Sequence, residues 1–343
     1  MAVFTQSVPR GFREKLYEIN WAFVLLILLI GCIGVAMLYS VEGGAWDPYA
    51  ARHAVRFTAG VGLMVTVALF PPRFWMGIAY PAFVGALLLL VGVELFGVTA
   101  MGAQRWLDIG PIRIQPSELM KIALVLALAR YYHDLPEERV STLGGLMIPA
   151  VMIGAPMGLI VLQPDLGTSV LLGATGAAIV FMAGLSWKVI LGALGFAVTG
   201  AWVYLQYFIA PYQLSRIQTF LDPEADPMGE GYQILQSKIA LGSGGATSKG
   251  FMEGSQAHLN FLPEKQTDFI FTMLGEEFGF IGGTFVLVLY ALVLANCVLI
   301  AASCKSTFLR LTVMGVATTF ALYVFINVGM VMGLLPVWAS RCR

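Results

Sequence analysis

The stretch WAFVLLILLIGCIGVAMLYS, residues 21–40, decides the fold class of this chain. It contains no charged side chain, and a helix of about twenty apolar residues matches the roughly 30 Å thickness of the hydrocarbon core of a bilayer. The basic residues Arg10, Arg13 and Lys15 precede it, and no small-residue cleavage pattern follows it. The stretch therefore predicts a transmembrane helix that acts as an uncleaved signal anchor.

The composition of the whole chain indicates the same class of protein. Of its 343 residues, 58% are hydrophobic and only 12% are charged, whereas soluble domains average about 25% charged residues. The apolar runs are unbroken, which favours helices over the alternating segments, about ten residues long, of a transmembrane barrel. The formal net charge of zero gives no indication of a nucleic acid partner. Four widely spaced cysteines and three scattered histidines form no disulfide or zinc-binding pattern.

Nine apolar runs predict nine transmembrane helices. They cover residues 21–40, 54–70, 74–92, 118–132, 144–162, 168–184, 187–209, 269–302 and 311–335. The expected fold is an all-α polytopic membrane bundle, a single domain over residues 1–343 with one large extracytoplasmic loop at 210–267. The eighth run is longer than one crossing requires, so we expect its first turns to lie at the interface or the helix to tilt.

The distribution of basic residues predicts which end of the bundle faces the cytoplasm. The positive-inside rule favours a cytoplasmic N-terminus, because long translocated loops contribute little to it. Four arginines in short outer loops run against the rule: Arg52, Arg56, Arg105 and Arg113. We interpret these exceptions as a sign that an anionic group binds on the outer face.

Asp268 is the strongest candidate for a catalytic residue. It lies between the polar loop and the apolar run that begins at Phe269, and placing a charge in hydrocarbon costs roughly 2.5–3.5 kcal/mol or more. An alternative is that Asp268 or Thr267 caps the following helix. Glu276 and Glu277 in the same run also require partners, for which arginines of neighbouring helices are candidates.

A second candidate pair, Glu118 and Lys121, lies at the start of the fourth apolar run. Pro116 and Ser117 form a helix start, with Ser117 as the expected N-cap. Glu118 and Lys121 are three residues apart, so they share one helix face and can pair. The alternative is a capped helix with a surface ion pair. Lys121 lies one turn into an apolar helix, however, where it must face protein or a wet cavity.

Two turns have roles that the residues leave open. Asp165, in the short turn before the sixth run, either caps the next helix or lines the same outer cavity. The glycine-rich segment 241–250 fails the GxxxxGK[ST] spacing of a phosphate loop, although its backbone N–H groups are candidates for phosphate binding. Glu94, two residues after the third run, is expected to reach the outer interface.

Five long segments carry a resemblance to a known family. They are RWLDIGPIRIQPSELMK at 105–121, QPDLGTS at 163–169, GEGYQILQSKIALGSGG at 229–245, HLNFLPEKQTDFIFTMLGEEFG at 258–279 and INVGMVMGLLP at 326–336. Together they resemble the SEDS family (shape, elongation, division and sporulation) of bacterial cell-wall proteins. The short N-terminal tail and the last segment favour its rod-shape branch over its division branch.

The resemblance implies an enzyme and a site. It implies a peptidoglycan glycosyltransferase that polymerises lipid II on the outer face of the bacterial cytoplasmic (inner) membrane during cell elongation and rod-shape maintenance. Asp268 would be the general base that deprotonates the 4-hydroxyl of the acceptor sugar. The pyrophosphate leaving group requires cations. The implied substrate- and pyrophosphate-binding residues are Arg52, Arg56, Arg105, Glu118, Lys121 and Asp165.

The resemblance also implies partners and leaves alternatives. A divalent cation, Mg²⁺ or Mn²⁺, is a further candidate at the pyrophosphate, and no organic cofactor is expected. A class B penicillin-binding protein, which supplies the transpeptidase, and the elongation machinery are the expected protein partners. Two alternatives are a lipid II flippase, which predicts polar groups across the membrane depth, and a non-catalytic scaffold of the elongation machinery.

The end of the chain departs from the family pattern. Family members continue after Leu-Leu-Pro-Val with a Ser-Tyr-Gly-Gly segment and a tenth span, whereas this chain ends in WASRCR at 338–343. One lost base explains the difference. After loss of one G, the codons CCG GTG GTG GGC GTC GCG CTG CCG, for Pro-Val-Val-Gly-Val-Ala-Leu-Pro, become CCG GTG TGG GCG TCG CGC TGC CGC when the next codon supplies the final C, and these encode residues 336–343 as found.

We therefore predict that residues 338–343 arise from a frameshift, either a sequence error or a truncating mutation. Sequencing the gene through and beyond codon 337 should reveal the displaced frame. A gene with no displaced frame beyond that codon would contradict the prediction.

Overall fold

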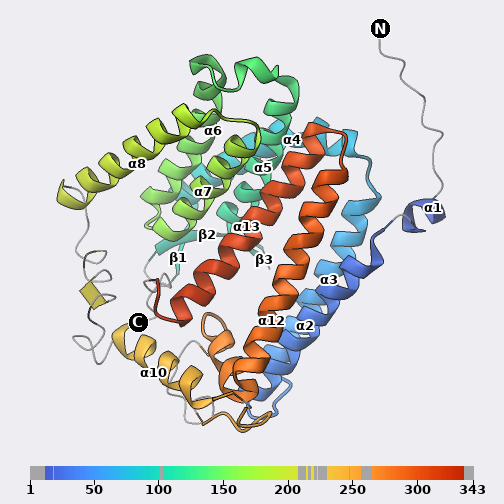
Figure 1. Ribbon diagram of the computed structural model, residues 1–343, viewed down its shortest axis with the longest axis vertical. Coiled ribbons are helices and arrows are strands. Elements are labelled where there is room, and N and C mark those ends of the chain that lie inside the picture. The colour runs from blue at the N-terminus through green and yellow to red at the C-terminus, as the bar shows by residue number, and fades with distance from the viewer. Residues whose placement is uncertain are drawn as a thin grey trace.

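The chain folds as a helical bundle (Figure 1). The computed structural model describes residues 12–17, 19–100, 103–110, 112–207, 230–246, 248–255 and 265–335, together with positions 214, 218, 219 and 222. The tail at 338–343 lies outside these residues.

Helices within the described residues lie over all nine predicted spans. They are α2 (Trp21–Val41), α3 (Tyr49–Leu69), α4 (Pro72–Phe96), α5 (Pro116–Asp134), α6 (Leu143–Leu162), α7 (Leu166–Met182), α8 (Trp187–Tyr207), α12 (Ile270–Ser303) and α13 (Thr307–Val331). In the described part of the chain, five of them (α2, α4, α6, α12 and α13) are long and apolar enough to cross a membrane by length and composition. The all-α polytopic fold is confirmed, and the protein is a multi-pass membrane protein.

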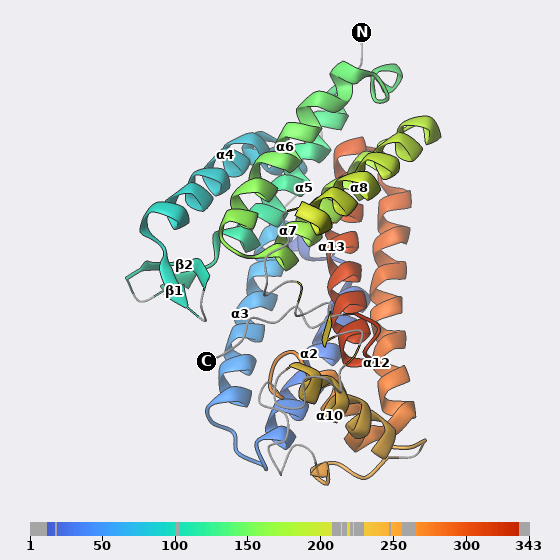
Figure 2. The ribbon, with the colours of Figure 1, turned by 90° about the vertical axis from the view of Figure 1, so that its left-hand side faces the viewer.

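Shorter elements connect these helices. They are α1 (Phe12–Tyr17), β1 (Val98–Ala100), β2 (Ala103–Ile109), β3 (Ile112–Ile114), the 3₁₀ turn η1 (Glu137–Arg139) and α10 (Glu230–Ser243). The strands form an antiparallel sheet in the order β1-β2-β3 between α4 and α5. Figures 1 and 2 show the α12–α13 connection toward one end of the bundle and α10 at the other.

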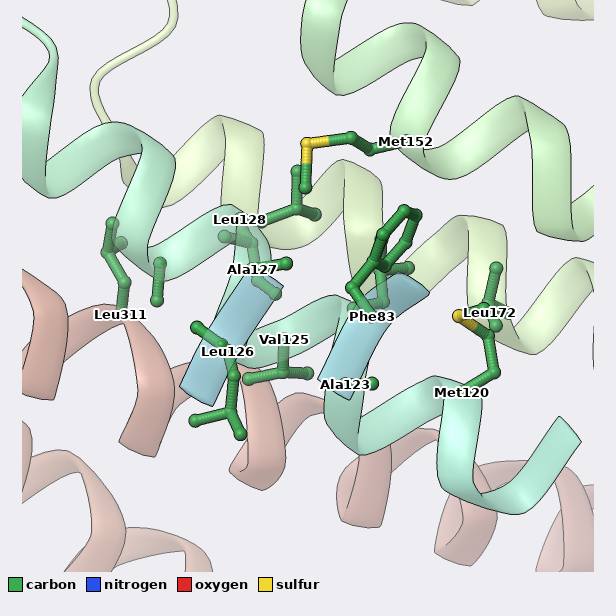
Figure 3. Packing of buried hydrophobic residues seen from close by; sticks show 14 of the residues in the cluster. Phe83, Met120, Ala123, Val125, Leu126, Ala127, Leu128, Met152, Leu172 and Leu311 are labelled. Atoms are coloured by element: carbon green, nitrogen blue, oxygen red, sulfur yellow. The ribbon is translucent and has the colours of Figure 1, made fainter. Parts of the chain in front are cut away.

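Helix α5 lies at the centre of the larger hydrophobic core. It contacts α4, α6, α7 and α13, so the run Ala123–Ala129 is buried on every side. Figure 3 shows α5 residues packed against side chains from the surrounding helices: Phe83, Met152, Leu172 and Leu311. The alanines of α5 permit this close approach, because small residues allow membrane helices to pack tightly.

The long helix α12 is broken rather than simply tilted. Gly279 has φ 63° and ψ −164°, a conformation outside the helical region that glycine adopts readily. Before the break, Phe271 and Met273 are buried in a second core with Met37 of α2. The first turns of α12 therefore pack against protein, which explains the excess length of the eighth apolar run.

The segment after α10 covers this break. The Gly250 N–H donates to the Glu277 carbonyl (3.1 Å), and the Phe280 N–H donates to the Gly245 carbonyl (2.9 Å). A Cβ atom at Gly244 would lie 2.1 Å from the Gly275 carbonyl oxygen. The segment 244–250 is thus a close-packed cover for the backbone that the break exposes.

Phosphate binding by the glycine-rich segment remains a prediction, with few donors left for it. Four N–H groups of the segment already donate within the protein: Gly244 to Ala240, Gly245 to Gly242, Ser248 to Gly244 and Gly250 to Glu277. A backbone donor that is used in this way is not available to an anion.

Replacing Gly244 with alanine should destabilise the protein, because the new methyl group would overlap backbone atoms of α12. We expect a loss of about 1–3 kcal/mol, the usual effect of overpacking, seen as a lower thermal midpoint in detergent. Gly242→Ala is the matched control, since a Cβ atom there meets nothing within 4 Å. Equal midpoints for the two variants would contradict this account of the segment.

Candidate active site

Most of the candidate residues lie at one end of the bundle. Successive spanning helices run in opposite directions, so the starts of α3, α5, α7 and α12 face the same side. Those starts carry Arg52, Glu118, Asp165 and Asp268 respectively. The side of the bundle that the sequence predicted to be outer therefore gathers the candidate charges.

Asp268 lies directly before the start of α12. The N-cap position of that helix is Phe269, which makes no side-chain capping bond within the described residues. Neither Thr267 nor Asp268 occupies the N-cap position, contrary to the alternative. The Asp268 side chain is partly exposed.

The backbone around Asp268 is held firmly. Three side chains bond across this segment: Lys265 Nζ donates to Val41 O (3.2 Å), Gln266 Nε2 to Glu42 Oε1 (2.6 Å) and Asn327 Nδ2 to Asp268 O (3.1 Å). Phe269, the next residue, is fully buried. A partly exposed carboxylate on a fixed backbone is the arrangement expected of a catalytic group.

Glu118 and Lys121 form the predicted pair. Their Oε1 and Nζ atoms lie 2.7 Å apart, with the Lys121 side chain 4% exposed and that of Glu118 52% exposed. Tyr323 of α13 joins them, since its hydroxyl contacts Lys121 Nζ and lies 3.3 Å from Glu118 Oε1. The lysine is therefore buried against protein, and the alternative of a surface ion pair is wrong.

The predicted N-cap of α5 is also wrong. The cap position is Gln115, and Pro116 takes the first helical position, where its missing N–H has no consequence. Ser117 lies inside the helix and is buried.

Asp165 has the first of the two roles that the sequence left open, and its place in an outer cavity remains a prediction. It is the N-cap of α7, since its carboxylate accepts bonds from the Thr168 N–H (3.2 Å) and hydroxyl (2.9 Å). The same carboxylate lies 3.7 Å from Arg105 Nε, and an Arg105 Nη2 group donates to the Pro164 carbonyl. The pair connects strand β2 to the start of α7.

Arg52 and Arg56 are placed differently. Both are exposed and lie four residues apart on one face of α3. Within the described residues, neither forms an ion pair or hydrogen bond with the other candidates. Glu94, near the end of α4, is exposed as expected.

Glu276 and Glu277 have partners in the segment 249–255 and at the end of α2, and the expected arginine partners remain a prediction. Glu276 accepts bonds from Lys249 Nζ (2.6 Å) and Ser255 Oγ (2.9 Å). Glu277 accepts bonds from Ser40 Oγ (2.5 Å) and the Met252 N–H (3.3 Å). Both carboxylates are buried, and both hold the segment 249–255 against α2 and α12.

Two apolar cavities flank α2. One, of about 290 Å³, lies among α2, α12 and α13 and is lined in part by Ile270, Tyr323 and Asn327. The other, of about 590 Å³, lies between α2 and α3 and is lined in part by Trp46 and Phe57. Both cavities therefore adjoin segments that carry candidate residues.

The described residues contain no group of three or more His, Cys, Asp or Glu side chains that could hold a metal ion. The donor set on this part of the chain does not fit a metal site built from protein ligands alone. The expected divalent cation remains a prediction.

Sequence reasoning missed three members of the site. Tyr323 and Asn327 lie in an apolar run without charges, so nothing local distinguishes them from packing residues. Ser40 likewise ends an apolar span. Each of them contacts a residue that lies 59 to 237 positions away in the chain. Contacts between such distant residues leave no local pattern in the sequence.

Comparisons with known proteins give a consistent result. The family described as "Cell cycle protein", which covers FtsW, RodA and SpoVE, matches residues 20–339. "Peptidoglycan glycosyltransferase MrdB" of Escherichia coli K12 is 41% identical over 315 residues, which cover 92% of this chain and 84% of that protein. "Peptidoglycan glycosyltransferase RodA" of Treponema pallidum is 30% identical over 395 residues and covers 93% of this chain and 91% of that protein.

Solved structures agree. A chain of the structure "Structural coordination of polymerization and crosslinking by a peptidoglycan synthase complex" has a TM-score of 0.80 and 31% identity, covering 94% of this chain and 90% of that chain. The rod shape determining protein RodA of Thermus thermophilus has a TM-score of 0.67 and 27% identity, covering 93% of this chain and 87% of that chain. The chain belongs to the FtsW, RodA and SpoVE family of cell cycle proteins, the SEDS family that its motifs resemble.

Proposed function

We propose that this protein is a peptidoglycan glycosyltransferase that polymerises lipid II during cell elongation. The observation that carries the proposal is Asp268, a partly exposed residue in a segment that three side-chain hydrogen bonds anchor to the rest of the protein. The relatives named peptidoglycan glycosyltransferase support it, since they match over more than nine-tenths of this chain.

Asp268 acts as the general base in this proposal. Its carboxylate accepts the proton of the acceptor 4-hydroxyl while that oxygen attacks the anomeric carbon of the lipid-linked donor. The bond from the anomeric carbon to the pyrophosphate breaks in the same displacement, which inverts an α-linked donor to a β-glycoside. General base catalysis of this kind contributes roughly 10²- to 10⁴-fold to the rate.

The cations divide into two groups. Arg105 and Lys121 each face a carboxylate, Asp165 and Glu118 respectively, so much of their charge is balanced within the protein. Arg52 and Arg56 are exposed on α3. We assign the first contact with the pyrophosphate to this exposed pair, because an unbalanced charge attracts an anion more strongly.

The α2–α3 cavity fits the lipid part of the same substrate. It is almost wholly apolar in its lining, and Ala54, Phe57 and Thr58 of that lining surround Arg56 in sequence. A pyrophosphate on the arginines would therefore place a prenyl chain beside this cavity, where its burial is favourable.

The flippase alternative loses its main support. Glu276 and Glu277 were the acidic groups inside a span, and both are bonded to the segment 249–255 or to the end of α2. They are part of the packing at one end of the bundle rather than a path across it.

The remaining assignments are proposals that rest on family membership. We place the protein in the bacterial cytoplasmic (inner) membrane, with its site on the extracytoplasmic face. A class B penicillin-binding protein is the proposed partner, supported by the similarity to a chain of a peptidoglycan synthase complex. A divalent cation, Mg²⁺ or Mn²⁺, at the pyrophosphate is also proposed.

Asp268→Asn should abolish polymerisation of purified lipid II. The amide has nearly the same shape but does not accept the proton, so the rate should fall by roughly 10²-fold or more. The full chain and its variant are compared with and without the penicillin-binding protein, and glycan strands are separated on gels. Equal polymer from both proteins would overturn the assignment of the base. Polymer from neither, even with the partner, would favour the flippase or the scaffold.

Replacing both Arg52 and Arg56 with glutamine should weaken use of the lipid-linked substrate. A hydrogen bond to a charged group contributes about 1.5–3 kcal/mol, so kcat/KM should fall by roughly 10-fold or more. Arg73→Gln is the control, since Arg73 is exposed at the start of α4, on the opposite side of the bundle. Unchanged kcat/KM in the double variant would remove these arginines from the site.

A further inference from the structure

A polar stripe runs along one face of α13. Thr319, Tyr323 and Asn327 are spaced four residues apart, so their side chains lie above one another on the helix. Each reaches a different segment: Thr319 pairs with Thr175 of α7 (3.2 Å), Tyr323 with Lys121 of α5, and Asn327 with the Asp268 carbonyl (3.1 Å). Polar groups in a membrane helix generally face partners of this kind.

Two of these contacts touch the candidate active site. Tyr323 lies against the Lys121–Glu118 pair, with the Lys121 ammonium 4.4 Å from the centre of its ring. Asn327 holds the backbone of Asp268 itself. Four residues of a helix rise about 6 Å. The rigid helix α13 therefore fixes the position of Lys121, the buried cation, relative to Asp268, the proposed base.

We propose that Asn327 and Tyr323 are positioning residues for glycosyl transfer. Asn327 fixes the backbone from which the Asp268 carboxylate projects, and Tyr323 fixes Lys121 and Glu118 relative to it. The inference rests on the proposed role of Asp268. Neither side chain transfers a proton or bonds to a reacting atom.

The surroundings of Asn327 explain why its hydrogen bond matters. Asn327 lines the 290 Å³ cavity together with Ile270 and Phe271, which follow Asp268 closely in the chain. That cavity is mostly apolar, so it offers little to replace a lost polar contact. Without the Asn327 amide the segment loses the anchor that bonds Asp268 directly, and a displacement of about 1 Å can lower a catalytic rate by roughly 10²-fold.

Asn327→Leu tests the inference at Asp268. We expect kcat for lipid II polymerisation to fall by roughly 10- to 100-fold, with KM within about threefold because substrate contacts are retained. Asn327→Gln keeps an amide donor and should recover most of the lost rate. Asn296→Leu is the matched control, since Asn296 bonds only to Leu292 of its own helix among the described contacts.

Tyr323→Phe tests the other end of the stripe. The variant keeps the ring over Lys121 and removes the hydroxyl, so kcat should fall without a matching rise in KM. Tyr290→Phe is its control, because Tyr290 lines the same cavity and its hydroxyl forms no hydrogen bond in the described part of the chain.

The outcomes separate this inference from the proposed function. An inactive Asp268→Asn protein beside Asn327→Leu and Tyr323→Phe proteins with normal kcat would overturn the inference alone. An active Asp268→Asn protein would overturn the proposed base and the inference with it. If Asn327→Leu loses activity only in proportion to a loss of folded protein, Asn327 is structural and the inference is wrong. A lower kcat at an unchanged thermal midpoint, recovered by Asn327→Gln, supports it.

Discussion

The break in α12 at Gly279 is the feature on which the end of the molecule that carries Asp268 depends. In a membrane protein, backbone groups that leave a helix must find new partners within the protein. Here the segment 244–255 supplies them, through Gly250 and Gly245, and the buried carboxylates of Glu276 and Glu277 fasten the same segment. The short piece of α12 before the break is thereby held in a protein core rather than in lipid, and Asp268 stands at its start.

Helix positions followed from the sequence because lipid exposure requires long apolar runs, and such runs are visible without any knowledge of tertiary contacts. The nine expected runs correspond to α2–α8, α12 and α13 within the described residues. The structure differs from the fold expected from the sequence in two places. The break at Gly279 depends on a cover that arrives from a distant segment. The sheet β1-β2-β3 consists of short strands, whose pairing within a polar loop leaves little periodicity.

The site could be predicted in part, for a related reason. A charge beside or inside an apolar run has few structural explanations, which is why Asp268, Glu118 and Lys121 were identifiable. Their uncharged partners were not, because Tyr323 and Asn327 are ordinary residues for a membrane helix until the fold brings α13 against α5 and α12. Asp165 shows a different limit: the sequence indicated that its carboxylate caps α7, but not that the same carboxylate pairs with Arg105, because Arg105 lies in a distant strand.

The distribution of charge suits an enzyme that must both bind and release pyrophosphate. If every cation of the site were unbalanced, the leaving group would be held as tightly after the reaction as before it, and uniform binding of this kind does not raise kcat. Pairing Arg105 with Asp165 and Lys121 with Glu118 weakens the attraction between these cations and the pyrophosphate before the reaction. A balanced pair still contributes when negative charge develops nearby, because the cation attracts the new charge without leaving its carboxylate. In the proposed function Lys121 suits this role, since it is buried where charges interact strongly, whereas the charge of its half-exposed partner Glu118 is partly screened by solvent.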